Sequence, residues 1–217
     1  MEAELRQYLL YQLTHPVTVK IVLKTSLIHG LGLFADENIP AGTLVAYYPV
    51  IYSYNPKTCL FYSISDEEKT DDELRLMIDR YSMTGPKEYL FLGDPKEHGV
   101  HSTTCEPVEQ TGAIGHLLND GIDLSKMKKV AKAVKLRPRK ATVIEFMQMY
   151  YKHSKSNVHH QHGEGGVHMV ATRDIKAGEE LLYSYDFHYW MNALVPDLPM
   201  AKHNELVDAV GEQLALH

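Results

Sequence analysis

The spacing of hydrophobic residues predicts several amphipathic helices. In these stretches apolar side chains recur every three or four residues, which places them on one face of a helix. Thr70 and Glu73 form a capping-box pattern at the start of one stretch, and Pro16 and Pro138 follow two others. The helices are expected at residues 2–14, 70–81, 125–137 and about 141–150, with a final helix after Pro199. In this final helix, Leu206, Val210 and Leu214 are expected to face inward. The inward faces of the two middle helices are expected to comprise Met127, Val130, Ala131 and Val134, and Val143, Phe146, Met147 and Tyr150.

Alternating apolar and polar residues predict short strands between the helices. Residues 17–23 alternate in this way, as in a half-buried strand. Glycines and prolines then punctuate further short strands, one beginning at Thr43 and one at residues 88–92. Residues 163–166 are typical of a hairpin tip, and a strand pair is expected around residues 179–185. Many short strands with helices inserted between them predict an α+β fold dominated by β-structure.

Composition narrows the class of protein. A chain of 217 residues suits one ordinary domain with appendages, and 44% hydrophobic with 23% charged residues is a globular composition. No apolar run approaches the length of a membrane span, and the first residues lack the layout of a signal peptide. Cys59 and Cys105 cannot form a disulfide framework, so we expect a reducing, intracellular location in the nucleus or cytoplasm.

Charge is unevenly distributed along the chain. Residues 126–140 hold eight basic side chains and no acidic ones. Because the net charge of the whole chain is −6, the remaining residues carry a net charge of −14. An acidic body favours a basic partner. The basic run has three interpretations: a nucleic-acid contact, a nuclear signal, or a solvated helix face, which is the commonest use of such a run. A nucleic-acid contact would use Lys126, Lys128, Lys129 and Lys132.

Three short segments carry residues suited to chemistry. The first holds Gly30 and Gly32, which leave the backbone open to a ligand, although no third glycine completes a dinucleotide fingerprint. In the second, Asn119 precedes an Asp-Gly pair, a pattern that a simple turn would also explain. In the third, Tyr183 and Tyr185 follow a Lys-Ala-Gly turn and, taken singly, would be ordinary strand aromatics.

Together, in this order, the segments resemble the SET domain of protein lysine methyltransferases. The family's opening motif resembles GLGLFADENIPAGTLVAYYPV, its Arg-Phe-x-Asn-His motif resembles HLLND, and its closing motif, ending in Asp-Tyr-Gly, resembles ATRDIKAGEELLYSYD. The resemblance covers about residues 20 to 190. It implies a fold of several short sheets in which the Asn and Tyr segments meet in a pseudoknot. S-adenosylmethionine would bind on one face, and the substrate lysine would enter from the other through a channel of tyrosines.

The resemblance also implies roles for individual residues. Asn119 matches the asparagine that contacts the cofactor's amino group, and Tyr185 matches the usual catalytic tyrosine. Trp190 lies where relatives place an aromatic ring against the adenine. The residues so implied for the cofactor are Gly30, Leu31, Gly32, Leu118, Asn119, Asp120, Tyr185 and Trp190, and those for the substrate channel are Tyr47 and Tyr183.

The implied reaction is methyl transfer from S-adenosylmethionine to a lysine of a histone or another basic protein, which leaves S-adenosylhomocysteine. The lysine must be neutral to attack, and its reference pKa is about 10.4. Tyrosine hydroxyls can orient the amine without adding a negative charge that would stabilise the ammonium form. A non-catalytic SET-like module that binds a protein partner is the alternative function.

The chain departs from the family pattern at several positions. Asp120 stands where the family has histidine, His116 where it has arginine, and Asp186 where it has the glycine of the closing motif. The nearest counterpart of the family's Pro-Asn pair is Asn157, which lies beyond an insertion of about residues 122–156. The side-chain hydrogen bonds at these positions must therefore differ from those of relatives.

The expected layout is an N-terminal helix at 1–16, a SET domain at 17–190 and a C-terminal helical segment at 191–217. Inserts are expected at about 55–110 and, with the basic helix, at about 122–156. No metal site is expected. There is no cysteine after Cys105 for a post-SET zinc cluster, and the histidines at 153, 159, 160, 162 and 168 fit no standard zinc pattern.

Overall fold

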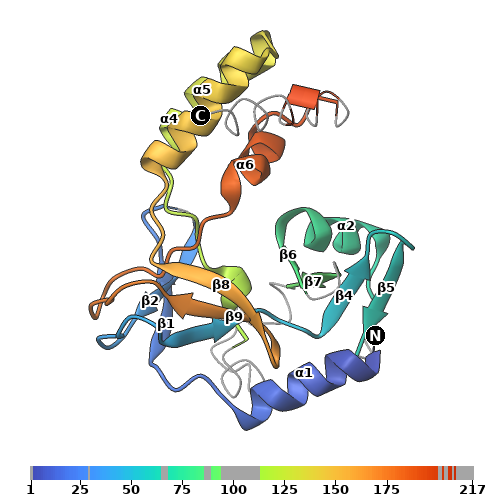
Figure 1. The fold of residues 1–217 in the computed structure, drawn as a ribbon, viewed down its shortest axis with the longest axis vertical. Helices are drawn as coiled ribbons and strands as arrows, with labels where there is room; N and C mark the ends of the chain where they lie inside the picture. Colours follow the sequence, from blue (N-terminus) through green and yellow to red (C-terminus); the bar gives the residue numbers. More distant parts are fainter. Residues whose placement is uncertain are drawn as a thin grey trace. The chain divides into compact units, whose positions relative to one another are not determined.

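The computed structural model describes residues 2–28, 30–64, 68–85, 89–93, 113–199, 202, 205, 206 and 208. The chain divides into two compact units, each built from two segments (Figure 1). The first unit comprises Met1–Leu118 and Asn157–Leu181, and the second comprises Asn119–Ser156 and Leu182–His217. Cys105, Val210 and Leu214 lie outside the described residues, so the predictions that involve them are not tested.

The described part of the first unit contains three small antiparallel sheets. The sheet orders are β1-β2, β3-β9-β8 and β5-β4-β7-β6. Together with the helices described next, these sheets confirm the predicted mixture of helix and short strands. The strands are β1 (Ile21–Thr25), β2 (Leu31–Ala35), β3 (Leu44–Tyr47), β4 (Tyr52–Asn55), β5 (Leu60–Ser63), β6 (Ser82–Thr84), β7 (Leu90–Leu92), β8 (Val158–Gly163) and β9 (Gly166–Ala171).

In the described part of the first unit, the helices are α1 (Glu2–Thr14) and α2 (Asp71–Arg80), with the 3-10 turn η2 (Gly115–Leu117). The capping box expected from the sequence is present at the start of α2, where Thr70 and Glu73 bind each other's backbone N–H groups. The hairpin tip is also present, between β8 and β9. The strand predicted at residues 17–23 is misplaced, because pairing with β2 begins only at Ile21 and runs to Thr25.

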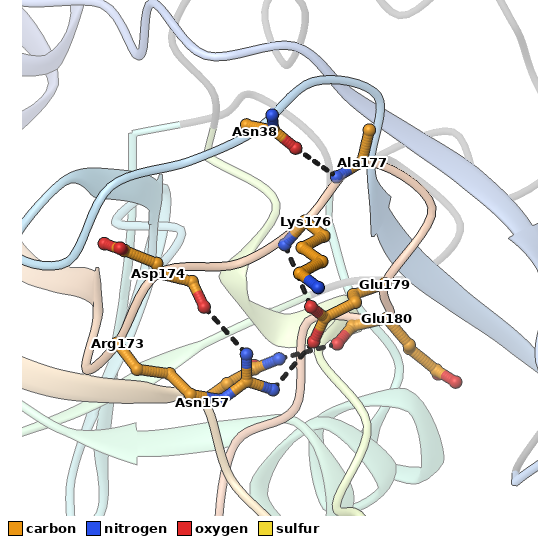
Figure 2. Close-up of polar contacts among 8 residues, drawn as sticks. All are labelled: Asn38, Asn157, Arg173, Asp174, Lys176, Ala177, Glu179 and Glu180. Carbon is orange, nitrogen blue, oxygen red and sulfur yellow. Dashed lines mark hydrogen bonds and ion pairs between the residues drawn. The ribbon is translucent and has the colours of Figure 1, made fainter.

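Two turns of similar sequence cross in the first unit. One begins at Asn38 and the other at Asp174, and each reads Asn/Asp-Ile-x-Ala-Gly. Ile39 and Ile175 each donate the backbone N–H to the other's carbonyl at 2.8 Å. The Asn38 side chain accepts the alanine N–H of the opposite turn at 3.0 Å (Figure 2), and the Asp174 side chain does the same in reverse at 2.9 Å. Each turn therefore caps the other.

The second unit is helical. It contains α4 (Leu124–Leu136), α5 (Lys140–His153) and α6 (Asp186–Leu194), and α4 and α5 lie side by side (Figure 1). Residues 202, 205, 206 and 208, which follow Pro199, are also helical. All eight residues predicted to face inward from α4 and α5 are buried in one hydrophobic cluster, which also includes Trp190 and Leu206. The period of 3.6 residues was sufficient to predict these two helices because a single core covers one face of each.

The closing segment differs from its prediction. Instead of a strand pair around residues 179–185, the structure has isolated bridges: Glu180 pairs with Phe34, and Leu182 pairs in parallel with Asn119. No continuous strand forms in this segment, because the residue paired with Glu180 belongs to a different part of the chain from the residue paired with Leu182. Helix α6 then begins at Asp186, although the sequence had indicated a helix only after Pro199, and it runs through the expected boundary at residue 190.

No helix among the described residues combines the length and apolarity needed to cross a membrane.

The first testable prediction concerns a buried amide of α1. Gln12 is fully buried, and its side-chain nitrogen donates to the carbonyls of Gly165, at 2.8 Å, and Tyr48, at 3.4 Å. Gln12→Ala should lower the free energy of unfolding by about 1–3 kcal/mol, because buried carbonyls lose their donor. Urea denaturation measures this change. Gln7→Ala is the matched control, since Gln7 is exposed on the same helix, and equal effects of both changes would contradict the assignment.

Candidate functional site

The opening glycines shape an exposed piece of backbone in the first unit. Gly30 has φ of +43°, a Cβ placed there would meet nothing within 4 Å, and Gly30 and Leu31 are both exposed. The Gly30 carbonyl accepts the N–H of Ser26 at 2.8 Å, which closes the turn between β1 and β2. Gly32 is buried within β2. This turn therefore offers open backbone, as a ligand contact through N–H and C=O groups requires.

Tyr47 is buried at the end of β3 in the first unit. Its hydroxyl donates to the carbonyl of His15 at 2.8 Å, and its ring meets His168 edge-on with centroids 5.1 Å apart. Burial, and secondarily Tyr11, raise the pKa of the Tyr47 phenol. The hydrogen bond to His15 and the ring contact with His168 therefore fix the Tyr47 side chain within the first unit.

Residues of the closing motif in the first unit form hydrogen bonds and an ion pair that fix Asn157 and the turn after Asp174. Asn157 is buried and donates its side-chain amide to the carbonyl of Glu180 at 2.9 Å (Figure 2). Arg173 forms an ion pair with Glu179 at 2.7 Å, and the Glu179 carboxylate also accepts the N–H of Lys176 at 2.9 Å. Asn157 thus contacts the closing motif even though the insertion separates it from Asn119 in sequence.

Asp120 is the centre of the polar network in the second unit. It is 0% exposed. Its Oδ2 accepts three hydrogen bonds, from the Tyr150 hydroxyl at 2.7 Å, the Trp190 indole N–H at 2.8 Å and the backbone N–H of Tyr185 at 3.0 Å. Its Oδ1 accepts a longer bond from Ser154 at 3.4 Å. One carboxylate therefore joins α5, α6 and the residue that precedes α6.

The Tyr150 hydroxyl extends this network. Because its single proton goes to Asp120, its oxygen is left to accept from Ser184 at 2.6 Å and from the N–H of Asp186 at 3.0 Å. Burial and the nearby Asp120 charge raise the pKa of Tyr150. Burial also raises the pKa of Asp120, whereas its hydrogen bonds, first that from Trp190, act in the opposite direction.

Asn119 and the closing tyrosines lie beside Asp120 in the same unit. The carbonyl of Asn119 accepts the N–H of Tyr183 at 2.9 Å. The ring of Tyr185 stacks on that of Trp190, with an angle of 11° between the ring planes. It contacts the ring of Tyr189 edge-on, with the ring centroids 4.9 Å apart. Burial, and then the charges of Asp186 and Asp120, raise the pKa of Tyr183 to about 12, so this phenol is neutral at physiological pH.

Asp186, where the family pattern has glycine, adopts a left-handed backbone conformation. Its φ is +73°, in the left-handed region that glycine occupies most easily and that Asp tolerates better than most residues. Its carboxylate accepts the N–H of His188 at 3.3 Å and so caps the first turn of α6. Aspartate at this position therefore supplies both the left-handed turn and a cap for α6.

The predicted residues fall into two groups. Asn119, Asp120, Tyr183, Tyr185 and Trp190 form one cluster in the second unit. The remaining predicted residues, Gly30, Leu31, Gly32, Tyr47 and Leu118, belong to the first unit.

Sequence reasoning missed three members of the network, Tyr150, Ser154 and Ser184. Tyr150 was assigned only to the hydrophobic face of its helix, where its hydroxyl was the one signal that a polar partner is needed. Among the described residues, no group of three or more His, Cys, Asp or Glu side chains could hold a metal ion.

A sequence model of the SET domain matches residues 30–186 of this chain, which include all three motifs. The chain belongs to the SET domain family. No curated protein matches it. Among solved structures, it is similar to a Plasmodium falciparum protein described as a candidate histone methyltransferase, with 16% sequence identity and a TM-score of 0.38 over 78% of this chain and 95% of that one. The family assignment rests on the SET sequence model.

The second prediction concerns the Asp120 network. Asp120→Ala should lower the free energy of unfolding by about 2–4 kcal/mol, because it leaves the buried Trp190 indole and the Tyr185 N–H without an acceptor. Asp120→Asn is the matched control, since its amide oxygen can take the place of Oδ2, and it should cost less than Asp120→Ala. Urea denaturation at neutral pH measures both, and equal losses would contradict the network.

A comparison of the wild type with Asp120→Asn also gives a test by pH. A carboxyl group whose pKa is raised on folding stabilises the protein most below its unfolded pKa, about 3.9, and this contribution is lost as pH rises through the folded pKa. The stability of the wild type relative to Asp120→Asn should therefore fall as pH rises from about 4. A difference that grows with pH would show that the hydrogen bonds outweigh burial.

Proposed function

We propose that this protein is a protein-lysine N-methyltransferase that uses S-adenosylmethionine, with a lysine of a histone or another basic protein as acceptor. Membership of the SET family supports a SET-type methyltransferase in general. The main support for the proposed cofactor and acceptor is the cluster around Asp120. In this cluster Asn119 accepts the N–H of Tyr183, and the rings of Tyr183 and Tyr185 contact each other. The acidic charge outside residues 126–140 favours a basic acceptor.

Several features of the described residues support the choice of this cofactor. Gly30 presents exposed backbone with open space where a side chain would stand, which suits contact with the methionine part of the cofactor. Asn119 is assigned to the cofactor's amino group, and the backbone groups of Leu118 and Asp120 are assigned to the neighbourhood of the adenine. When bound, the cofactor supplies a methyl group activated by the sulfonium. Trp190 is assigned to the adenine by its aromatic face, since its N–H is already bound to Asp120.

The chain's own residues orient and desolvate the acceptor amine. The lysine must lose its proton to solvent before its lone pair can form the new N–C bond while the C–S bond breaks. Tyr183 is a neutral phenol, so it adds no negative charge that would favour the ammonium form. Tyr185 is assigned the catalytic position, with its ring in contact with Trp190 and Tyr189. A ring held in one rotamer places its hydroxyl accurately, and positioning can supply several kcal/mol of a barrier.

The third prediction tests the catalytic role. Tyr185→Phe should lower methyl transfer from isotope-labelled S-adenosylmethionine to core histones by about 100-fold or more, because the hydroxyl that orients the amine is lost. The fold should persist, since Asp120 binds the backbone of residue 185 and not its hydroxyl. Tyr62→Phe, the same change on β5, should leave the rate unchanged. Equal rates for the wild type and Tyr185→Phe would refute the role.

The fourth prediction tests cofactor binding. Asn119→Ala should weaken binding of S-adenosylmethionine by about 10-fold or more, because a side-chain hydrogen bond to a charged group is worth about 1.5–3 kcal/mol. Calorimetric titration measures the affinity, and Asn192→Ala on the exposed side of α6 is the control. Unchanged affinity would contradict the role of Asn119. A wild-type protein that binds no cofactor would instead support the alternative of a non-catalytic binding module.

A further inference from the structure

Helix α4 carries a row of exposed basic side chains opposite its buried face. Met127, Val130, Ala131 and Val134 are buried in the core of the second unit, which leaves Lys128, Lys129 and Lys132 exposed on the other side. Arg137 and Arg139, in the connection to α5, are also exposed. We call these five residues, Lys128, Lys129, Lys132, Arg137 and Arg139, the basic segment.

The basic segment is not neutralised by the described part of the protein. Two neighbouring lysines are paired: Lys126 with Asp123 at 3.3 Å and Lys135 with Asp197 at 3.1 Å. No residue of the basic segment has an ion pair with a described acidic residue. The sequence from residue 124 to residue 144 contains no Asp or Glu at all. A helix face that only contacts water usually mixes both signs of charge, whereas here like charges lie one turn apart and repel each other.

The spacing of these charges suits a row of phosphates. A helix rises 1.5 Å per residue, so the four steps from Lys128 to Lys132 span about 6 Å, and Lys128, Lys129 and Lys132 lie on one side of the helix. The two arginines continue the charge beyond the end of α4. A nucleic-acid duplex carries one negative charge about every 1.7 Å along its axis, so several of these side chains can meet phosphates at once.

The surroundings of the charges favour a duplex over other polyanions. Residues 124–144 contain no aromatic side chain, and stacking on aromatic rings is the usual basis of single-strand binding. The apolar face of α4 is buried in the protein core, so it is not free to enter a lipid bilayer. A phosphate backbone that is recognised by charge alone needs neither feature.

We propose that the basic segment binds the phosphodiester backbone of a nucleic-acid duplex without reading its sequence. This surface is separate in the chain from the residues assigned to methyl transfer, and its function does not depend on that activity. Lys126, which the sequence analysis had included among the contacts, is left out because Asp123 already pairs with it.

The fifth prediction measures duplex binding by fluorescence anisotropy on the full chain, between 50 and 200 mM salt. The probe is a labelled 20-base-pair DNA of arbitrary sequence. With five phosphate contacts, the logarithm of the association constant should fall with the logarithm of salt concentration with a slope of about −4.5. Lys128→Gln, Lys129→Gln and Lys132→Gln combined should weaken binding at least 10-fold and reduce the slope by about 2–3. The variant should unfold at the same temperature as the wild type.

The matched control removes the same charge elsewhere. Lys20→Gln, Lys24→Gln and Lys176→Gln combined also lower the net charge by three, at exposed positions of the first unit. Binding should stay within twofold of the wild type. An equal loss in both variants would overturn the proposal, because it would show attraction by total charge alone. Tighter binding to single-stranded oligothymidine or to anionic lipid vesicles than to the duplex would overturn it too, whereas equal binding of duplex RNA would support backbone recognition.

Discussion

The second unit depends on one buried carboxylate oxygen. Oδ2 of Asp120 accepts a hydroxyl, an indole N–H and a backbone N–H, and the donors come from residues that are 30, 70 and 65 positions away. A buried carboxylate is costly unless donors surround it, and here three donors converge on one oxygen. The arrangement therefore fixes α5, α6 and the backbone of Tyr185 relative to Asn119-Asp120, which sets the position of the tyrosine ring.

This network explains how the chain tolerates aspartate where the family has histidine. A neutral imidazole offers one donor and one acceptor, whereas a carboxylate only accepts and can take several bonds. The change therefore requires additional donors, and the insertion provides one of them: Tyr150 projects from α5 to Asp120. The insertion is thus part of the framework of the closing motif as well as the carrier of basic side chains.

Sequence alone predicted those elements whose signal is local or periodic. The buried faces of α4 and α5, the capping box of α2 and the hairpin tip between β8 and β9 follow from patterns within a few residues. The closing segment could not be predicted this way, because its partner changes from residue to residue. The crossed turns at Asn38 and Asp174 share the sequence pattern Asn/Asp-Ile-x-Ala-Gly, which is visible in the sequence. The pattern does not show that each side chain accepts an N–H of the opposite turn, because that pairing depends on the fold.

A buried negative charge beside the proposed catalytic tyrosine raises a question about the chemistry. A free carboxylate near the acceptor would hold its lysine in the ammonium form and so oppose methyl transfer. Asp120 does not act in this way, because it is fully buried and its Oδ2 is occupied by three donors. Burial is the main cause that raises the pKa of Tyr150 and Tyr183, and the charge of Asp120 acts in the same direction, after that of Asp186 for Tyr183. The Asp120 carboxylate therefore supplies rigidity, and in the proposed reaction Tyr183 would offer the substrate amine a neutral hydroxyl.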